Sequence, residues 1–341
     1  MGRMWEHRAT LLLTRADVRA LLDLDACINA VEAAFRAHAD GATITPGVLG
    51  THVPGGGFHV KTAGLMRPAR PPGGRAYYAA KVNANFPENA ARRQLPTIQG
   101  VIALHDAEDG RLLALLDSME ITTLRTAAAT AAAARHLARA DSRLLTVLGC
   151  GTQGRSQLRA LCRVRPVECV YAWDADPTAA AAYAEDMTRA LGCVVRHVRD
   201  YRDAVPRSDV VVTCTPSRQP LLTAADVPAG CFVAGVGADS EEKQELAPDL
   251  LARGTLVVDV LEQCARIGDL HHALAAGAMR REDVHAELAD VVSGRRRGRS
   301  TDDEVTVFDS TGTALEDVAA AALVYERATG HGRGVEVRLG D

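Results

Sequence analysis

The sequence predicts an α/β protein: a Rossmann-type domain with a doubly wound parallel sheet, together with a discontinuous α+β domain. Three observations predict this fold. An apolar run ends in a glycine-rich turn, strand-like and helical segments alternate after that turn, and about 140 residues precede it. A chain of 341 residues is also longer than a typical single domain, and its length predicts two.

The glycine-rich turn follows the apolar run 144–148 and has the pattern Gly149-x-Gly151-x-x-Gly154. A helical pattern over 153–163 follows directly, and this strand–turn–helix context is typical of a dinucleotide-binding site. Gly149 permits the tight turn, and Gly151 lets the backbone approach a pyrophosphate. Gly154 lets the helix pack closely on the strand.

The choice of cofactor follows from the end of the next strand-like run, 167–173. Asp174 lies there, 25 residues after Gly149, about where an acidic residue contacts a ribose 2′-OH. Asp176 follows closely, and no lysine or arginine stands beside it to receive a 2′-phosphate. The sequence therefore predicts NAD(H) rather than NADP(H).

Beyond Asp174 the segments alternate as a parallel sheet requires. We expect helices or helical stretches at 177–191, 248–253 and up to 292, and strands at 194–198, 209–214, 231–236, 256–261 and 305–308. Ligands bind such a sheet beyond the carboxyl ends of its strands. The predicted cofactor-binding residues are therefore Gly149, Gly151, Thr152, Gln153, Gly154, Asp174, Thr215, Ser217, Val236 and Gly237.

The part before the glycine turn mixes helical and strand-like patterns. We expect helices at 16–39 and 122–138, strands at 57–60, 77–82, 97–104 and 112–117, and a Pro/Gly/Arg-rich loop at 67–75. A terminal helix at 314–329 has apolar residues at helical spacing. If this helix packs back on the N-terminal part, the first domain is discontinuous.

Composition restricts the classes of partner. The net charge of −4 gives no electrostatic reason to expect nucleic acid or an anionic membrane, and the short cluster Arg295–Arg299 is expected to be a solvated loop. No apolar leader and no apolar run of about 18 residues is present. The eight cysteines are widely spaced and form no Cys-x-x-Cys pair, so we expect no metal site and reduced thiols in a cytoplasmic protein.

Two cations outside the glycine turn suit chemistry on an amino acid. Lys81 is expected to end an apolar strand, and Arg125 is expected in the first turn of the long helix. Arginine grips a carboxylate through two hydrogen bonds, and a partly buried lysine shifts its pKa readily enough to carry a proton. On spacing alone, ordinary solvated charges remain the alternative.

Six motifs, in order, resemble the ornithine cyclodeaminase/mu-crystallin family. They lie at 81–89, 95–100, 117–128, 149–154, 236–239 and 308–317. The resemblance covers nearly the whole chain. It implies a nucleotide-binding domain at 126–312, a substrate and dimerisation domain made of 1–125 and 313–341, and a homodimer.

The resemblance also implies roles for individual residues. Lys81 matches the family's active-site lysine, and Arg125 matches the arginine that holds the substrate carboxylate. Asp239 matches the aspartate that binds the distal amine in cyclodeaminases. Thr311 and Gly312 match the backbone that closes the nicotinamide pocket.

The chain departs from the family pattern at two positions. Val48 lies where members commonly carry a second carboxylate-binding arginine, and Lys61 lies where an apolar residue is common. We hypothesise that Lys61 replaces the missing cation at a substrate carboxylate; the alternative is a surface lysine at a strand end. His59 is expected on the same strand face as Lys61.

The expected activity is NAD(H)-dependent hydride transfer at the Cα of an amino acid or its imine, as in an imino-acid reductase or an amino-acid dehydrogenase. An ornithine cyclodeaminase, which converts ornithine to proline and ammonia with catalytic NAD, is the first alternative. A non-catalytic, crystallin-like nucleotide-binding protein is the second. Val48 and Lys61 favour net oxidoreduction over the ornithine reaction.

Overall fold

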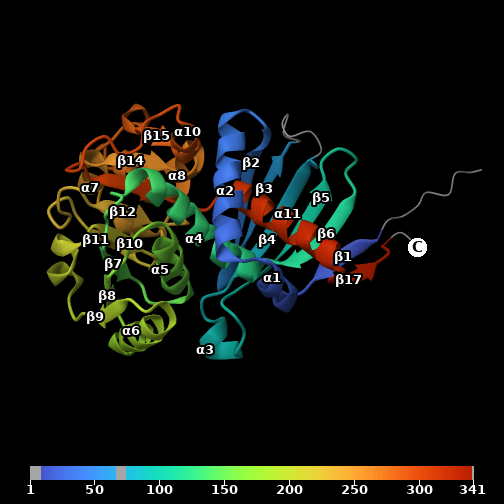
Figure 1. The fold of residues 1–341 in the computed structure, drawn as a ribbon, viewed down its shortest axis with the longest axis horizontal. Helices are drawn as coiled ribbons and strands as arrows, with labels where there is room; N and C mark the ends of the chain where they lie inside the picture. Colours follow the sequence, from blue (N-terminus) through green and yellow to red (C-terminus); the bar gives the residue numbers. More distant parts are fainter. Residues whose placement is uncertain (1–8, 67–73, 340–341) are drawn as a thin grey trace, which may run out of the picture. The chain divides into compact units, whose positions relative to one another are not determined.

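The computed structural model describes residues 9–66 and 74–339, which form two compact units. Unit 1 combines Met1–Arg125 with Thr313–Asp341, and unit 2 is Thr126–Gly312. The C-terminal helix α11, drawn in red, accordingly lies among the blue and teal strands of unit 1 (Figure 1). The predicted fold class, a parallel α/β domain with a discontinuous α+β domain, is confirmed.

A seven-stranded sheet forms the frame of unit 1, in the order β17-β1-β6-β5-β4-β3-β2. Neighbouring strands from β2 to β6 are antiparallel, and β1 pairs in parallel with β6. The strands are β1 (Thr10–Leu13), β2 (Thr43–Val53), β3 (Gly56–Leu65), β4 (Tyr77–Asn85), β5 (Ile98–Asp106), β6 (Leu112–Asp117) and β17 (Val335–Val337).

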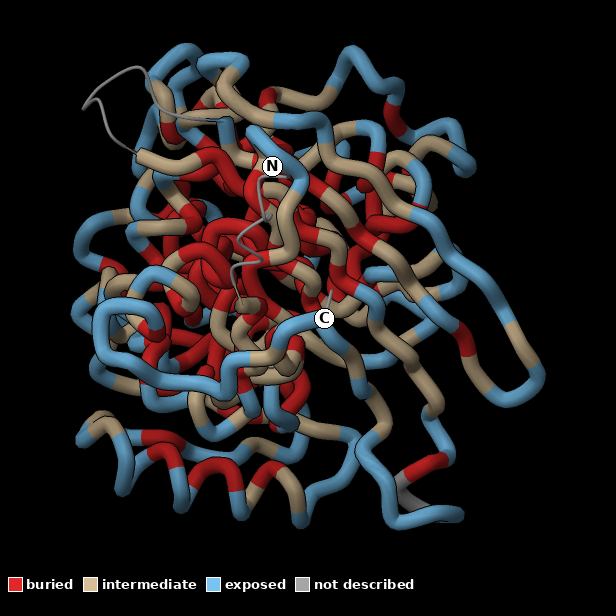
Figure 2. Tube along the Cα trace, turned by 90° about the vertical axis from the view of Figure 1, so that its right-hand side faces the viewer, coloured by how far each residue is buried: buried red, intermediate tan, exposed pale blue. Residues whose placement is uncertain are grey.

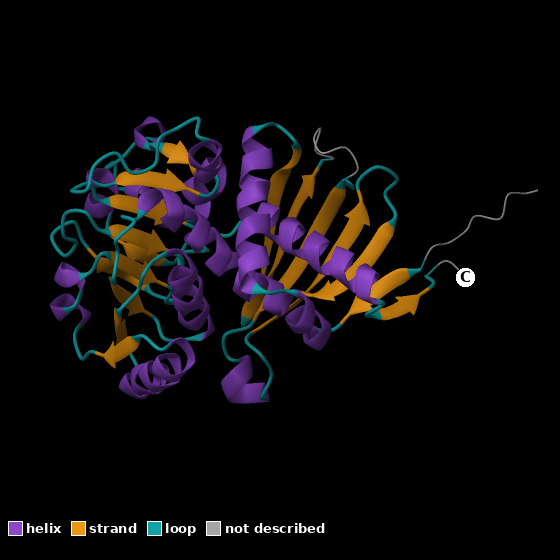
Figure 3. Ribbon diagram, in the orientation of Figure 1, coloured by secondary structure: helices purple, strands orange, loops and turns teal. Residues whose placement is uncertain are grey.

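Helices α2 and α11 cover one face of this sheet (Figure 3). The helices that contribute to unit 1 are α1 (Arg15–Leu21), α2 (Leu24–Ala39), α3 (Asn89–Arg93), the start of α4 (Ser118–Leu137) and α11 (Ala314–His331). A single helix over 16–39 was a wrong prediction. The helix is interrupted because the Asp23 carboxylate accepts a hydrogen bond from the backbone N–H of Ala26 and begins a new helix there.

The other face of the sheet carries apolar side chains that α2 and α11 do not cover. Leu49, Val60, Val82 and Val101 form one row across β2, β3, β4 and β5. Leu49, Val82 and Val101 are exposed, and Phe58 is exposed two residues along β3 from Val60. Apolar side chains gathered on one exposed face are typical of surfaces that bind another protein.

Unit 2 contains the parallel sheet, in the order β15-β14-β16-β12-β10-β7-β8-β9. Its strands are β7 (Leu144–Leu148), β8 (Cys169–Trp173), β9 (Val194–His197), β10 (Val210–Thr213), β12 (Phe232–Gly235), β14 (Thr255–Val258), β15 (Ala286–Glu287) and β16 (Thr306–Asp309). The central strands are fully buried, as expected for a sheet covered on both faces.

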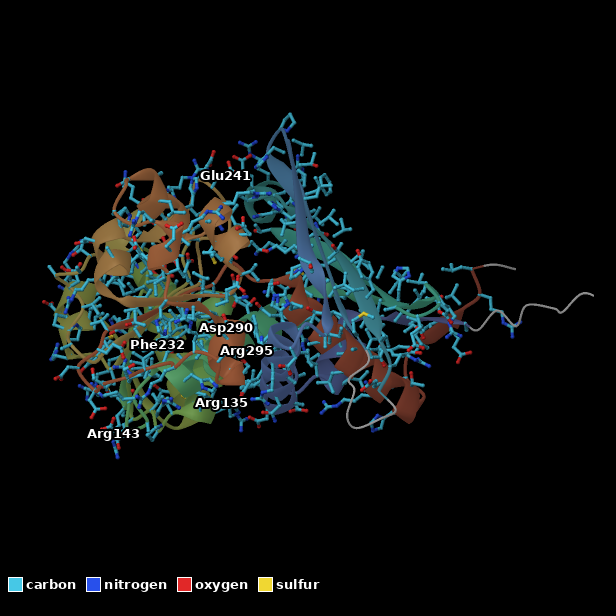
Figure 4. The ribbon with its side chains drawn as sticks, turned by 90° about the horizontal axis from the view of Figure 1, so that it is seen from above. Arg135, Arg143, Phe232, Glu241, Asp290 and Arg295 are labelled. Atoms are coloured by element: carbon cyan, nitrogen blue, oxygen red, sulfur yellow. The ribbon has the colours of Figure 1, made fainter. Side chains whose placement is uncertain are left out.

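Helices flank this sheet, and a second small sheet pairs β11 (Arg218–Leu222) with β13 (Gln244–Leu246). The helices are α5 (Thr152–Val164), α6 (Pro177–Leu191), α7 (Pro248–Arg253), α8 (Leu261–Ile267), α9 (Asp269–Ala275) and α10 (Leu288–Ser293). Phe232 lies in the interior of unit 2, whereas the side chain of Arg143 points outward (Figure 4). Buried stretches run through the interior, and exposed loops surround them (Figure 2).

The glycine turn and its flanking elements lie where the sequence predicts them, whereas several N-terminal elements differ. Strands β3 and β4 are longer than expected, so Lys81 is in the middle of β4 and not at its end. Strand β2 was not predicted. Of the expected loop 67–75, residues 67–73 lie outside the described residues.

Candidate active-site residues

Lys81 is buried in unit 1 beneath helix α11. Only 2% of its surface is exposed, and its Nζ lies 2.6 Å from the Oδ2 of Asp317. The partner strands β3 and β5 flank β4 on both sides and fix the backbone at Lys81. The side chain therefore has one well-defined position among charged groups.

Arg125 joins the same cluster from helix α4. Its Nη1 donates to Glu316 Oε2 at 2.7 Å, and its Nε lies 2.9 Å from Asp317 Oδ1. Glu316 also accepts a hydrogen bond from the backbone N–H of Thr313, in a capping box that begins α11. Two adjacent carboxylates at one helix start therefore hold Arg125 and Lys81 together.

The electrostatics of this cluster favour a lysine that changes its protonation state near neutral pH. Burial lowers the pKa of Lys81, the charges of Arg125 and Lys61 lower it further, and Asp317 opposes them; the result is about 7. Burial alone would raise the pKa of Asp317, but the charges of Arg125 and Lys81 hold it below its ordinary value. Asp317 therefore stays ionised while Lys81 titrates.

Lys61 lies directly opposite Lys81 on the neighbouring strand β3. Only 9% of its surface is exposed, so the alternative of a surface lysine at a strand end is wrong. Val48 is the opposite residue on β2, which places the two departures from the family pattern side by side. His59 is two residues along β3, and strand alternation puts it on the same face as Lys61.

Sequence reasoning assigned no role to Glu316 and Asp317, although both lie in the motif 308–317. A usable signal was present. Thr313 followed three residues later by Glu316 is the capping-box pattern, which predicts a helix start rich in carboxylates. What the pattern could not show is that these carboxylates face two cations from distant parts of the chain.

In unit 2 the glycine turn has the geometry that a dinucleotide needs. Gly149 has φ +101°, a conformation that side chains rarely adopt, and a Cβ on Gly154 would overlap the carbonyl oxygen of Gly149. A Cβ on Gly151, by contrast, would meet no atom within 4 Å. The open space at Gly151 and the start of α5 at Thr152 together fit a pyrophosphate.

Asp174 lies beside this turn at the end of β8. Its carboxylate accepts hydrogen bonds from the backbone N–H of Cys150 at 2.7 Å and of Asp176 at 3.0 Å. The same side chain therefore shapes the turn and presents negative charge where a ribose is expected.

Glu245, which was not predicted, organises the loops after β10 and β12. The buried carboxylate accepts from the hydroxyls of Thr213 and Thr215, both at 2.7 Å, and from the backbone N–H of Gly237, also at 2.7 Å. Ser217 is bound to the same loop, because its backbone N–H donates to the Thr215 hydroxyl. The predicted residues Thr215, Ser217 and Gly237 are thus brought together around one carboxylate.

Asp239 lies just beyond this loop, after Val236 and Gly237. Its Oδ1 is 2.6 Å from the Nζ of Lys243, and 49% of its side chain is exposed. An exposed ion pair of this kind contributes little to stability, so the carboxylate can exchange partners at low cost.

Thr311 and Gly312 are fixed by another buried carboxylate, Asp259, which was also not predicted. Asp259 Oδ2 accepts from the backbone N–H of Thr311 at 2.8 Å and of Gly312 at 2.7 Å. The Gln263 amide donates to the Thr311 hydroxyl at 2.8 Å. These hydrogen bonds restrain the backbone of the loop after β16.

Asp269 and Asp309 complete a buried row of carboxylates that bind backbone N–H groups. Asp269 accepts from Glu245 and Leu246, and Asp309 accepts from Asp269 and Leu270. Burial and the neighbouring carboxylates raise the pKa of Asp269 well above its ordinary value. Strand-end loops in unit 2 are thus held by buried carboxyl groups that accept hydrogen bonds from backbone N–H groups.

The comparisons with known proteins identify the family of the chain. The model of the ornithine cyclodeaminase/mu-crystallin family matches residues 8–332. The chain belongs to that family. The motif resemblance described above is therefore confirmed, and it extends over both units.

Relatives within the family cover the chain almost end to end. An alanine dehydrogenase of Archaeoglobus fulgidus is 37% identical over 333 residues, covering 97% of this chain and 98% of that protein. The structure of Thermococcus litoralis Delta(1)-pyrroline-2-carboxylate reductase in complex with NADH and L-proline has a TM-score of 0.90 and 33% identity, covering 96% and 100%. That of an archaeal alanine dehydrogenase dimer with bound NAD has a TM-score of 0.91 and 36% identity, covering 97% and 99%.

Among residues 9–66 and 74–339, no helix is long and apolar enough to cross a membrane. Over the same ranges, no group of three or more histidine, cysteine or acidic side chains is arranged to hold a metal ion.

Proposed function

We propose that this protein is an NAD(H)-dependent oxidoreductase that transfers a hydride at the Cα of an amino acid or its imine. The observation that carries the proposal is the buried cluster of Lys81, Arg125 and Asp317 in a chain that also has a complete dinucleotide-binding turn. The named relatives, an alanine dehydrogenase and a pyrroline-2-carboxylate reductase, support the same reaction class.

The cofactor is NAD(H). The turn at Gly149, Gly151 and Gly154 holds its pyrophosphate, and Asp174 accepts hydrogen bonds from the ribose and repels a 2′-phosphate. Thr215, Ser217, Val236 and Gly237 line the nucleotide site, and the Thr311–Gly312 backbone closes the nicotinamide end. When bound, the nicotinamide supplies or accepts the hydride.

The unit 1 residues bind the substrate and move a proton. Arg125, which is paired with Glu316 and Asp317, binds the α-carboxylate, and Lys61 supplies the second cation that is missing at Val48. In the reductive direction, Lys81 donates a proton to the imine nitrogen as the hydride reaches Cα. In the oxidative direction, neutral Lys81 accepts that proton.

Asp239 is compatible with two outcomes of this chemistry. As a carboxylate that can exchange Lys243 for a substrate ammonium, it would bind the distal amine of ornithine and support cyclodeamination. The cationic pair Lys61 and Lys81 instead disfavours a substrate with an additional positive charge. We therefore propose net oxidoreduction as the main activity, with ornithine cyclodeamination as the alternative.

Two parallel assays test the proposal. Purified protein with NADH and Δ1-pyrroline-2-carboxylate should lose NADH absorbance and form proline, and the same reaction with NADPH should be much slower. Protein with L-ornithine and catalytic NAD should form neither proline nor ammonia. Proline and ammonia from ornithine would establish the cyclodeaminase, and no turnover with any imino or amino acid would favour a non-catalytic nucleotide-binding protein.

The open face of the unit 1 sheet supports a homodimer. Leu49, Val82 and Val101 are exposed apolar residues in one cross-strand row, and a second copy of the same row is its natural complement. The archaeal alanine dehydrogenase relative is described as a dimer. We include this assembly in the proposal, together with a cytoplasmic location.

A further inference from the structure

Lysine is rare in this chain. The sequence has 39 lysine and arginine residues, and only three of them are lysines: Lys61, Lys81 and Lys243. Two of the three are opposite each other on β3 and β4, and the third is paired with Asp239. Two of the three lysines in the chain are therefore neighbours in unit 1.

The two side chains differ in one property that matters here. A guanidinium stays charged in proteins, whereas a buried ammonium can lose its proton. Of these two residue types, only lysine suits a buried site that must give and take a proton near neutral pH. A permanent positive charge beside such a lysine would make its charged form less favourable and so promote the loss of its proton.

Lys61 and Lys81 have the geometry for such an effect. They are directly cross-strand neighbours, both buried, and both face α11. Side chains in this relation have Cβ atoms about 5 Å apart. The charge of Lys61 acts on both Lys81 and Asp317, so all three belong to one electrostatic group.

The charged groups around Lys81 come from three elements. Strand β3 contributes Lys61, α4 contributes Arg125, and α11 contributes Glu316 and Asp317. Strand β5 contributes only the apolar Ile102 opposite Lys81. Three cations thus share two carboxylates, and Arg125 cannot give up its charge. The least costly proton to lose is therefore one on a lysine.

We propose that Lys61 is a positioning residue for Lys81: its charge disfavours a second ammonium at Lys81 and keeps Lys81 able to give and take a proton near neutral pH. The use of that proton, on the imine nitrogen, rests on the proposed function. The electrostatic coupling of the two lysines does not depend on that function. Burial and the charge of Arg125 also lower the pKa of Lys81, so Lys61 adds to a decrease that these two causes already produce.

The scarcity of lysine makes a direct test practical. Protein labelled with 15N and 13C only in lysine should show three side-chain signals in NMR spectra, and each can be followed through a pH titration. Lys243→Arg and Lys61→Arg each remove one signal and so assign all three. No substrate or turnover is needed.

In the wild type, we expect Lys81 to titrate near neutral pH. Lys61→Met should move that midpoint upward by about 0.5–1 pH unit, toward the ordinary lysine value. Lys61→Arg, the matched control, keeps the charge and should leave the midpoint in place. Two results would overturn the proposal. One is an ordinary lysine midpoint for Lys81 in the wild type, which can be measured even if Lys61→Met does not fold. The other is an unchanged Lys81 midpoint in Lys61→Met.

Kinetics then separate this proposal from the proposed function. The alkaline fall in the rate of imine reduction should move to higher pH in Lys61→Met and stay in place in Lys61→Arg. A higher KM in Lys61→Met without any movement of the pH profile would leave Lys61 as a carboxylate ligand only and overturn the positioning role. If no imine is reduced at all, the proposed function fails while the NMR result stands by itself.

Discussion

At the scale of single residues, the unit 1 cluster depends on charges that are buried only because each has a partner. Asp317 is within ion-pair distance of both Lys81 and Arg125, and Glu316 holds the other side of the guanidinium. Removing one member of such a group leaves the others buried without compensation. Activity and stability should therefore fall together here.

Replacing Arg125 tests this directly. Arg125→Met should lower the free energy of unfolding by about 3–5 kcal/mol, because Glu316 loses its ion pair with Arg125 and Asp317 keeps only its ion pair with Lys81. It should also abolish detectable imine reduction. Urea unfolding followed by circular dichroism measures the first effect.

Arg15→Met provides the matched control for Arg125→Met. Arg15 forms an ion pair with Asp117 at 3.1 Å, and 42% of its side chain is exposed. Its loss should cost less than about 1 kcal/mol. Equal losses in the two variants would contradict the role assigned to the buried cluster.

The lowered pKa of Lys81 also predicts a pH dependence of stability. The folded protein releases this proton at about pH 7, whereas the unfolded chain keeps it up to about the ordinary lysine pKa of 10.5. Between these values the unfolded state binds more protons, so this residue makes stability rise with pH. Below about pH 7, Lys81 carries its proton in both the folded and the unfolded state and adds nothing to the pH dependence of stability.

Lys81→Met removes this contribution. The free energy of unfolding of the wild type, relative to Lys81→Met, should increase by roughly 1–2 kcal/mol between about pH 7 and pH 8.5. Urea titrations of both proteins at the two pH values give the difference. A difference that does not change with pH would mean that Lys81 has an ordinary pKa in the folded protein.

At the scale of elements, the glycine turn separates cofactor binding from folding. A Cβ at Gly154 meets the backbone of Gly149, whereas a Cβ at Gly151 meets nothing within 4 Å. One of these glycines is therefore needed by the protein itself. We expect the other to be needed only by a ligand that comes close to the backbone.

A pair of variants tests that separation. Gly154→Ala should both destabilise the protein and weaken NADH binding, because α5 must shift away from β7. Gly151→Ala should keep the melting temperature of the wild type but weaken NADH binding at least about tenfold. NADH fluorescence and thermal unfolding are the two measurements. Unimpaired NADH binding by Gly151→Ala would remove the turn from the cofactor site.

Elements differ in how far their sequence determines them. Strands β7, β8 and β10 were predictable because buried parallel strands are continuous apolar runs. Strand β2 was not, because its threonines, glycines and Pro46 resemble a loop, and only its pairing with β3 makes it a strand. For the same reason β4 continues through the turn-like residues Asn83–Asn85 and leaves Lys81 in mid-strand.

The candidate site shows the same limit. Lys81, Arg125 and the glycine turn could be chosen from the sequence, because their residue types and contexts match known chemistry. The carboxylates Asp317, Glu245 and Asp259 could not, because their roles arise from contacts with residues distant in the chain. Burial of Lys61 was equally invisible, since a lysine in an alternating strand predicts an exposed side chain.

At the scale of the whole molecule, the exposed apolar row on the unit 1 sheet predicts the oligomeric state. Val82→Lys combined with Val101→Lys places two charges on that face and should convert a dimer into a monomer. Sedimentation equilibrium measures the mass directly.

Val194→Lys is the control for the oligomeric state, because Val194 is an exposed valine on β9 of unit 2 and lies outside the row. It should leave the mass unchanged. Dimers that persist in the double variant would require a different interface.

The discontinuity of unit 1 also sets an order for synthesis on the ribosome. Unit 2 is continuous in sequence and can fold as soon as residue 312 has left the exit tunnel, whereas unit 1 waits for α11 and β17. Until then, the strand that carries Lys81 lacks both the helix that covers it and the carboxylate that pairs with it. A nascent chain stalled before α11 should therefore expose an uncompensated pair of lysines and an unfinished sheet, a state that chaperones recognise. Lys81 and Arg125 are therefore synthesised before Glu316 and Asp317, the carboxylates that compensate their charge.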